Sequence, residues 1–352
     1  METESIVPDE LRFAVTRKCD GACRHCYNQS GKDMDRLSSD DFIRIIKEVH
    51  TLNPNMDRIT LTGGEPLNEK DKVLEISRFS KSLGIRVRLV TRGWELNGDV
   101  CIELKEAGVS MVQIGLDSSG DFGYEDEFQV KWDTFHSWLR GDKLGFRKTV
   151  EAIKIAIGAG LDVSVRYSLC RSNFNDVVKT YQLISSLGVS KFKFRILFPD
   201  GRAKNRLIHE LISGGDMAKA QYDLIHASKD NQTVVEITQP CFYTLPGRDR
   251  LPKDGYQLNA FKELCPCGTI AAYIDSNGDV KYCLFDEKTL GNVCDDPFLT
   301  VWNSGLAKEA RTQRCPLDLS GSGCSSFKIL YAQFSDYPAF MSAYIKEVKE
   351  KK

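Results

Sequence analysis

Between residues 11 and about 198 the sequence alternates short β-branched runs with longer amphipathic stretches. Six such runs occur, and each is followed by a stretch with helical periodicity. The helical stretches begin at signals such as Ser38 and end at glycines such as Gly84 and Gly108. Strands that alternate with helices form parallel sheets with right-handed crossovers. We therefore predict an α/β fold with a partial (β/α)6 barrel similar to a TIM barrel, and chemistry at the carboxyl ends of its strands.

The chain changes character after residue 198, where the alternation stops. A loop-rich segment covers residues 241–267, and the strand-like runs TIAAYID and DVKYCLF follow it. Asn277 and Gly278 between these runs are typical of a β-hairpin turn. The expected parts are a barrel over 1–230, a small cysteine-rich domain with a β-hairpin over 231–326, and a helical tail over 327–352.

Composition excludes several classes of protein. The 352 residues include 48 basic and 49 acidic side chains, and a formal charge of −1 gives no electrostatic reason to bind nucleic acid or an anionic membrane. The first residues lack the regions of a signal peptide, and no apolar run approaches the ~20 residues of a membrane span. We therefore expect a cytoplasmic protein. In a reducing cytoplasm its 12 cysteines are expected to ligate metal, take part in catalysis or lie buried, and not to form disulfides.

Three cysteines lie far from any other cysteine in the sequence. Cys101 occupies an apolar position of a helical pattern and Cys170 ends a strand-like run, so both are expected to be ordinary buried residues. Cys241 follows a proline in a loop-like segment. It is another buried residue, a spare ligand or a reactive thiol, and it is the candidate hydrogen donor if the reaction needs one.

Cys19, Cys23 and Cys26 form a C-x3-C-x2-C motif directly after the first strand. A structural zinc site takes four ligands, and no fourth cysteine or suitably spaced histidine completes this one, since His25 lies between two of the cysteines. A [4Fe–4S] cluster held by three thiolates keeps one iron open for a ligand that is not protein. The motif therefore predicts an iron–sulfur cluster that binds a substrate.

This motif, with an aromatic-type residue before its last cysteine, resembles the radical S-adenosylmethionine (SAM) superfamily. The segment LTGGEP, Leu61 to Pro66, resembles the GGEP motif of that family at the end of the second strand. The resemblance implies that the three cysteines hold a [4Fe–4S] cluster whose open iron binds the amino and carboxylate groups of SAM. It also implies that Gly63, Gly64 and Glu65 receive the amino group, with the glycines letting the ligand approach the backbone.

The resemblance extends to four further cofactor-binding residues. Thr91 and Asp117 end the third and fourth predicted strands, where the family places contacts to the methionine part and the ribose. Arg166 lies in the fifth strand, and its guanidinium suits the SAM carboxylate. His25 would present its backbone near the adenine. A polar residue at a strand end is also a common cap, so Thr91, Asp117 and Arg166 keep that alternative.

The resemblance implies a radical reaction. SAM would be cleaved reductively to methionine and a 5′-deoxyadenosyl radical, which abstracts hydrogen from an unactivated carbon, with a reductase or a flavodoxin-type protein as the electron donor. Because the cofactor does the difficult chemistry, the protein positions the reactants and excludes solvent. We interpret the strand pattern as a closed, apolar barrel interior that suits this task.

The C-terminal cysteines resemble the SPASM and twitch subgroup of the same superfamily. Cys265, Cys267, Gly278 and Cys283 follow its C-x(9–15)-G-x4-C spacing, and the segments LGNV and VWNS resemble it too. So do Gly201-Arg202-Ala203 after the sixth strand, and His136 and Arg140-Gly141 before the fourth helix of the barrel.

This second resemblance implies one auxiliary [4Fe–4S] cluster, because fewer cysteines remain than full members carry. Its first-choice ligands are Cys265, Cys283, Cys315 and Cys324. Cys267 competes with Cys265, and Cys294 is a possible substitute for Cys315. Zinc remains the alternative metal, since a hairpin with two later cysteines is also a zinc-ribbon plan.

The leading hypothesis for function is an oxidoreductase-type radical SAM enzyme that modifies a peptide. Only about ten residues precede the first strand, which weakens this hypothesis because peptide maturases often carry a leader-binding domain there. The alternative is oxidation, decarboxylation or epimerisation of a small polar metabolite such as a sugar, amino acid or nucleoside. Residues 118–140 follow the fourth strand, where they would either cover the mouth of the barrel or form an ordinary surface insertion. A non-enzymatic iron–sulfur or zinc protein is the alternative from another class.

Overall fold

The computed structural model describes residues 6–237, 268, 270–284 and 288–312. Ten strands form one curved sheet in the order β12-β11-β10-β1-β2-β3-β4-β7-β8-β9, and β5 and β6 form a separate hairpin. The strands are β1 (Glu10–Thr16), β2 (Arg58–Gly63), β3 (Arg86–Thr91), β4 (Val109–Gly115), β5 (Tyr124–Glu125), β6 (Lys131–Trp132), β7 (Val163–Leu169), β8 (Lys191–Ile196), β9 (Val234–Ile237), β10 (Ala271–Ile274), β11 (Asp279–Lys281) and β12 (Thr289–Asn292). The helices are α1 (Ser39–Leu52), α2 (Lys70–Ser82), α3 (Gly98–Ala107), α4 (Phe135–Arg140), α5 (Gly145–Gly158), α6 (Val177–Ser186), α7 (Ala203–Arg206), α8 (Gly214–Ala227), α9 (Phe298–Trp302) and α10 (Gly305–Thr312), with short 3-10 helices η1 (Pro66–Glu69), η2 (Phe174–Asp176) and η3 (Ile208–Glu210).

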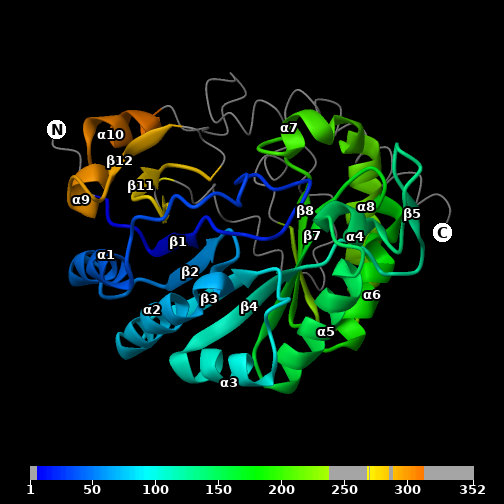
Figure 1. Ribbon diagram of the computed structural model, residues 1–352, viewed down its shortest axis with the longest axis horizontal. Coiled ribbons are helices and arrows are strands. Elements are labelled where there is room, and N and C mark those ends of the chain that lie inside the picture. The colour runs from blue at the N-terminus through cyan, green and yellow to red at the C-terminus, as the bar shows by residue number, and fades with distance from the viewer. Residues whose placement is uncertain (1–5, 238–267, 269, 285–287, 313–352) are drawn as a thin grey trace.

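The six predicted strands form the centre of this sheet. β1, β2, β3, β4, β7 and β8 pair in parallel, and the helices that connect them lie along the outside of the sheet (Figure 1). This arrangement confirms the predicted partial barrel. β9 adds another parallel strand beside β8, and β10 pairs in parallel with β1 before the chain turns through the predicted hairpin into β11.

Apolar side chains of the strands pack against these helices. Phe13 of β1 contacts Phe42 of α1 with their ring centroids 4.8 Å apart, and both belong to the main hydrophobic core. α1 begins at a capping box between Ser38 and Asp41. α3 ends at Gly108, whose φ of 100° is a left-handed conformation that glycine adopts without strain. Among the helices of the described ranges, none is long and apolar enough to cross a membrane.

The opposite face of the sheet is polar. Thr60, Arg88 and Lys193 alternate with the apolar strand residues and are each less than a tenth exposed. Arg88 Nη2 donates to Glu10 Oε1 at 2.9 Å, and Lys193 Nζ lies 3.2 Å from Glu236 Oε1. Burial, and then the Arg88 charge, lower the pKa of Lys193 to about 8, so cations of different strands lie near one another inside the barrel. The predicted apolar interior is therefore wrong, because charged residues such as Arg88 and Lys193 occupy strand positions that alternate with the apolar residues packed against the helices.

The segment between β4 and α5 lies at the mouth of the barrel, one of the two arrangements expected from the sequence. Its hairpin β5-β6 and helix α4 pack into a second apolar cluster with Cys170 and Leu197, which directly follow β7 and β8. Cys170 is fully buried in this cluster, and Cys101 is fully buried on α3, as predicted. Cys241 lies outside the described residues.

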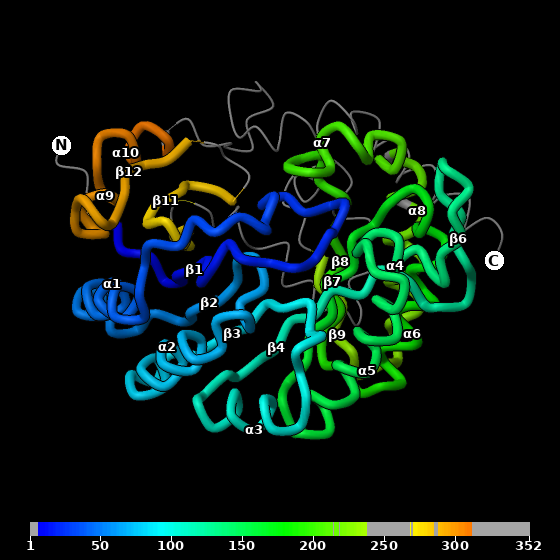
Figure 2. The backbone as a smooth tube through the Cα atoms, viewed as in Figure 1, coloured from blue at the N-terminus to red at the C-terminus, as the bar shows by residue number. Residues whose placement is uncertain are grey.

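The described C-terminal elements lie beside β1 and α1. β11, α9 and α10 cluster at this edge of the molecule (Figure 2). Arg17, which follows β1, donates from Nε to Asp275 Oδ1 at 2.8 Å and from Nη2 to Oδ2. Asp275 follows β10 and its side chain is only 1% exposed. A buried ion pair therefore joins the ends of two strands from opposite parts of the sequence.

Candidate active site

The loop after β1 brings together the cysteines of the first motif. Cys19 Sγ and Cys23 Sγ lie 3.3 and 3.7 Å from the position that a β-carbon on Gly21 would occupy. Cys26 is near enough to Cys23 to affect its pKa, and all three thiols are free and half-buried. Burial raises the pKa of Cys19 to about 11 and also raises that of Cys23. Thiolates in this loop therefore need a cationic partner, which a metal cluster provides.

The spacing of these thiols fits a cluster better than a single metal ion. Across the described ranges, no three His, Cys, Asp or Glu side chains lie close enough together to hold one ion. Thiolates on one zinc all lie about 2.3 Å from the same metal, whereas in a [4Fe–4S] cluster each thiolate binds a different iron. Thiols that share a loop without converging on one ion are compatible with a cluster, and the assignment of these three cysteines as its ligands stays a prediction.

Arg202, in the turn after β8, holds the cysteine loop through its carbonyl groups. Its Nη1 donates to Gly21 O and Cys23 O, each at 3.3 Å, and its Nη2 donates to Ser30 O. Its backbone N–H donates to Cys26 O at 3.0 Å. One side chain thus fixes the backbone on both sides of the thiols.

Two further contacts fix this loop. The Arg24 guanidinium lies 5.0 Å from the ring centres of both Trp132 and Trp138, in the segment that covers the barrel mouth. Gly201 has a φ of 59°, and a β-carbon there would lie 2.3 Å from Tyr27 O. Glycine is therefore needed at position 201 for conformation and for space.

Replacing Arg202 by methionine is expected to remove about half of the iron that the chain holds after anaerobic reconstitution, the share of one of two clusters. The loop would lose the side-chain hydrogen bonds that hold its carbonyls. Iron and sulfide analysis after desalting measures the effect. Lys204→Met on α7 is the control, because Lys204 is exposed. Full iron content in Arg202→Met would show that the loop does not depend on this clamp.

Glu65, a predicted SAM contact, is engaged by the protein itself. Thr91 Oγ1 donates to Glu65 Oε1 at 2.6 Å, and the backbone N–H of Arg92 donates to Oε2 at 3.0 Å. Glu65 is 1% exposed, and burial together with the charge of Glu95 raises its pKa to about 7. The structure therefore joins two of the predicted residues, Glu65 and Thr91, into one hydrogen-bonded unit at the ends of β2 and β3.

Gly63 and Gly64 make room for backbone. A β-carbon on Gly63 would lie 2.3 Å from Thr16 O, and one on Gly64 would lie 2.1 Å from Lys18 O. The N–H groups of Gly64 and Glu65 donate to these same two carbonyls at 2.7 and 2.9 Å. The close approach that these glycines permit is thus between β2 and the start of the cysteine loop, a role that the sequence analysis did not foresee.

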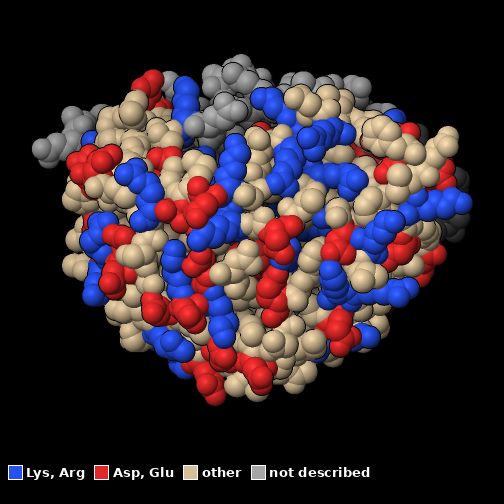
Figure 3. Space-filling model, viewed as in Figure 1, with Lys and Arg blue, Asp and Glu red and all other residues tan. Residues whose placement is uncertain are grey.

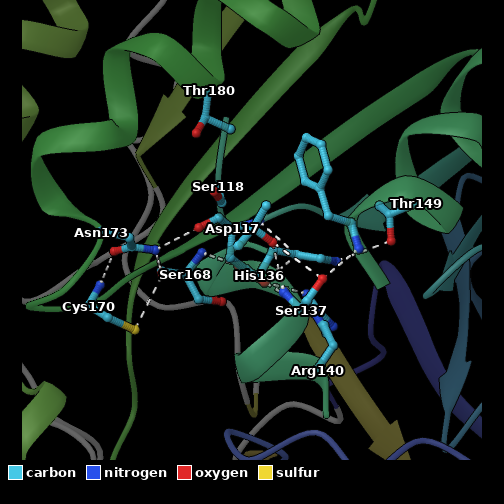
Figure 4. A network of polar contacts seen from close by, with 12 residues as sticks. Asp117, Ser118, His136, Ser137, Arg140, Thr149, Ser168, Cys170, Asn173 and Thr180 are labelled. Atoms are coloured by element: carbon cyan, nitrogen blue, oxygen red, sulfur yellow. Dashed lines mark hydrogen bonds and ion pairs between the residues drawn. The ribbon is translucent and has the colours of Figure 1, made fainter. Parts of the chain in front are cut away.

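Asp117 lies at the centre of a buried polar network (Figure 4). Its Oδ2 accepts from Arg140 Nε and Nη2 at 3.1 and 2.9 Å, and its Oδ1 accepts from the Ser168 N–H at 2.9 Å. Its own N–H donates to His136 Nδ1 at 3.1 Å, and Asn173 Nδ2 donates to its carbonyl at 3.0 Å. Burial alone would raise the pKa of Asp117, but the Arg140 guanidinium outweighs it and holds that pKa well below its usual range. Both carboxylate oxygens are thus engaged, and the ribose contact stays a prediction.

Arg166 and His25 lie close to the thiols of the cysteine loop. Arg166 lies near Tyr27 and Cys23, burial lowers its pKa, and within the described residues it forms no ion pair or side-chain hydrogen bond. His25 Nδ1 has no hydrogen-bond partner in the described part of the chain, and burial, followed by the charge of Arg140, lowers the pKa of His25 to about 3. A neutral imidazole and a guanidinium therefore belong to the surroundings of the thiols.

Two arginines beside the thiols were not assigned to the site from the sequence. Arg140 lies close enough to Cys23 to affect its pKa, and Arg92 lies close enough to Cys19 to do the same. The Arg140-Gly141 pair was noted only as a motif, and Arg92 had no signal beyond its place after Thr91.

Two C-terminal cysteines lie within the described residues. Cys283 is half-buried two residues after β11, and Cys294 is exposed. Cys294 Sγ lies 3.0 Å from the position of a β-carbon on Gly278, so it lies against the hairpin turn. The other proposed ligands, which lie outside the described residues and stay predictions, are Cys265, Cys267, Cys315 and Cys324.

Comparison with known proteins identifies both parts of the chain. The model of the radical SAM superfamily matches residues 13–184, and that of an iron–sulfur cluster-binding domain, SPASM, matches residues 265–325. An AdoMet-dependent heme synthase of Methanosarcina barkeri is 24% identical over 323 residues, which are 89% of this chain and 87% of that protein. Streptococcus suis SuiB bound to precursor peptide SuiA has a TM-score of 0.69 at 14% identity, over 92% of this chain and 71% of SuiB. anSMEcpe with bound AdoMet has a TM-score of 0.65 at 13% identity, over 97% of this chain and 100% of that one.

Proposed function

Because this chain belongs to the radical SAM superfamily and carries a SPASM domain, we propose that it abstracts hydrogen from an unactivated carbon of an anionic small molecule. As a member of this superfamily, the chain is an enzyme that uses SAM with a [4Fe–4S] cluster. Its SPASM domain binds auxiliary iron–sulfur clusters. The substrate and the residue roles below are our proposals.

Cys19, Cys23 and Cys26 are the proposed ligands of the SAM-binding cluster. The donor set fits, because the three thiols share one loop and burial raises the pKa of Cys19 and Cys23 unless a cation compensates. When bound, this cluster and SAM supply the electron and the 5′-deoxyadenosyl radical. The chain itself fixes the loop from β8 through Arg202 and covers it with the aromatic residues that hold Arg24.

The proposed SAM contacts surround this loop. Arg166 supports the assignment best, because its guanidinium lies near Cys23, forms no ion pair within the described residues and suits the SAM carboxylate. Glu65, with its pKa near neutrality, is placed at the end of β2 to accept from the SAM ammonium group. The remaining proposed contacts are His25 through its backbone, Gly63, Gly64, Thr91 and Asp117.

We assign a single auxiliary [4Fe–4S] cluster to the SPASM domain. Its proposed ligands are Cys283 with Cys265 or Cys267, Cys315 or Cys294, and Cys324. The hairpin supports this assignment, because it holds the half-buried Cys283 directly beyond β11. The cluster would accept an electron from the substrate radical, and an external reductase or flavodoxin-type protein would deliver the electron for SAM cleavage.

The proposal of an anionic substrate rests on the charge of the barrel interior. Basic side chains outnumber acidic ones on the polar face of the strands, with Arg12, Arg88, Arg166, Lys193 and Arg195 against Glu10 and Glu236. On the face of the molecule seen in Figure 3, by contrast, basic and acidic side chains are interspersed. An excess of positive charge on one surface attracts anions, so an anionic substrate is favoured inside. The relatives named heme synthase, which match most of this chain, also support a small molecule.

Peptide modification, the hypothesis favoured from sequence, is the second candidate. The structure most relevant to it is that of SuiB, which is bound to a precursor peptide and shares this fold. An acidic peptide segment would meet the same basic lining. The two candidates therefore differ in the size of the substrate and not in the charge that enters the barrel.

Deuterium transfer distinguishes these candidates. The reconstituted enzyme is incubated with SAM, dithionite and one deuterated probe at a time, either a carboxylate-bearing metabolite or an acidic peptide. Sugar acids, acidic amino acids and tetrapyrrole carboxylates make up the first set. We expect deuterium to appear in 5′-deoxyadenosine with a member of that set, as measured by mass spectrometry. Transfer from peptides alone would overturn the small-molecule proposal.

Lys193→Met tests the role of the basic lining in the same assay. Removing this inner charge is expected to raise KM for the anionic substrate about tenfold, the effect of losing ~1.4 kcal/mol of a charge-assisted contact. Substrate-independent cleavage of SAM should stay unchanged. Lys179→Met is the matched control, because Lys179 lies on α6 with its side chain 60% exposed. An unchanged KM would contradict the proposed binding region.

A further inference from the structure

Arg92, directly after β3, presents an unpaired N–H group to the cysteine loop. Its Nη1 is buried and has no hydrogen-bond partner in the described part of the chain. This atom lies 3.2 Å from the position of a β-carbon on Gly21, and Cys19 Sγ lies 3.3 Å from the same position. The absence of a side chain at Gly21 leaves the space between guanidinium and thiol open. An unsatisfied buried N–H is costly, which indicates that an acceptor belongs there.

Neighbouring carboxylates and an aromatic ring hold the rest of the Arg92 side chain in place. Its Nε donates to Glu95 Oε1 at 3.1 Å and lies 3.7 Å from Glu65 Oε2, while Nη2 pairs with Asp20. The guanidinium also lies 4.6 Å from the ring centre of Trp94. With its side chain only 8% exposed, Arg92 cannot turn toward water.

Arg140, at the end of α4, lies beside Cys23 as Arg92 lies beside Cys19. Its charge lies close enough to that thiol to lower the pKa of Cys23, while Asp117 accepts from its Nε and Nη2. A β-carbon on Gly115 would lie 2.1 Å from Arg140 Nη2, so only glycine at that position lets the guanidinium lie there. Two arginines, each oriented by carboxylates, therefore flank the two thiols.

We propose that Arg92 donates from Nη1 to the Cys19 thiolate of the loaded enzyme and, together with Arg140, raises the reduction potential of the SAM-binding cluster. This inference rests on the proposed function, which makes Cys19 and Cys23 ligands. Reduction adds one electron to the cluster, and hydrogen bonds and positive charge at its sulfurs stabilise the more negative, reduced state. The electron comes from an external one-electron donor of the flavodoxin type. Arg92 is thus a residue that tunes the cluster without touching the reacting atoms.

The test is an anaerobic redox titration of the full-length enzyme, followed by electron paramagnetic resonance. The SAM-binding cluster is identified as the signal that changes when SAM is added. Arg92→Gln is expected to lower its potential by ~59 mV, which is a tenfold change for one electron. Arg92→Lys keeps the charge and should restore most of the potential. Arg86→Gln is the control, an ion-paired arginine at the opposite end of the same strand, and should leave the potential unchanged.

A rate measurement adds a second readout. With a flavodoxin-type donor, SAM cleavage by Arg92→Gln should slow about tenfold, the fold-change of the reduction equilibrium. With excess titanium(III) citrate the rate should return close to that of the wild type.

A wild-type potential in Arg92→Gln with full iron content would overturn the inference. If Arg92→Gln does not hold the cluster, the potential of Arg92→Lys is the deciding measurement. A potential that falls by ~59 mV in Arg92→Lys, although the charge is retained, would also overturn the inference. A wild-type enzyme without any SAM-responsive signal would instead refute the proposed function.

Discussion

Replacing Cys19, Cys23 and Cys26 together by alanine is expected to abolish 5′-deoxyadenosine formation from SAM and dithionite. The thiols are half-buried and lie in a loop held by other residues, so the chain should still fold. Iron content should fall from about eight to about four per chain if the auxiliary cluster is present. Anaerobic assay of 5′-deoxyadenosine by liquid chromatography and iron analysis measure both effects.

Cys101→Ala is the matched control for this variant. Cys101 is a fully buried cysteine of α3, so its loss should cost some stability and no iron. 5′-Deoxyadenosine formed by the triple variant at the wild-type rate would contradict the assignment of the cluster to this loop. Loss of iron from Cys101→Ala as well would show that iron content reports folding and not ligation.

Replacing Asp117 by asparagine is expected to lower the free energy of unfolding by about 3 to 5 kcal/mol, the typical cost of removing one partner from a buried ion pair. Arg140 would remain buried beside a neutral amide, and its two hydrogen bonds to Oδ2 would lose their charge. The size of the side chain is conserved, so the effect comes from charge. Denaturant unfolding of the apoprotein, followed by circular dichroism, measures it.

Asp142→Asn is the control for this loss of charge. Asp142 pairs with Lys148 at 2.6 Å, but the Lys148 side chain is 42% exposed. Exposed pairs contribute about 0 to 1 kcal/mol, so this variant should be close to wild type. Equal stability of the Asp117→Asn and Asp142→Asn variants would show that the Asp117 network is not needed for folding.

The frame of the molecule could be predicted from the sequence because its signals are local. Each β-branched run became a strand, and Ser38 and Gly108 mark helix ends in the structure as they do in the sequence. The Asn277-Gly278 turn made a hairpin for the same reason. The placement of Cys19, Cys23 and Cys26 in one loop also follows from local spacing.

The polar interior was missed because charged residues are scattered within apolar runs. Arg12 and Arg88 were counted as parts of apolar strands, although the period of two sends them to the face away from the helices. A strand that is apolar at every second position has a polar opposite face, which is overlooked when the run is considered as a whole.

The surroundings of the thiols could not be predicted because they depend on contacts between distant segments. Arg202 reaches the loop from β8, and Arg92 reaches it from β3. Gly63 and Gly64 matched a known motif, but their contact with the backbone of Thr16 and Lys18 is a property of the packed sheet. Nothing in the spacing of residues along the chain specifies which side chain a strand end will meet.

The pairing of β1 with β10 also determines when the first cysteine loop can be completed. β1 leaves the ribosome before the other strands of the sheet, and segments synthesised first generally begin to fold first. Yet one edge of β1 pairs with β10, and Arg17 at its end is neutralised by Asp275, which is made 258 residues later. The loop that carries Cys19 therefore reaches its final support only late in synthesis, and a cluster delivered to the finished site must arrive after that.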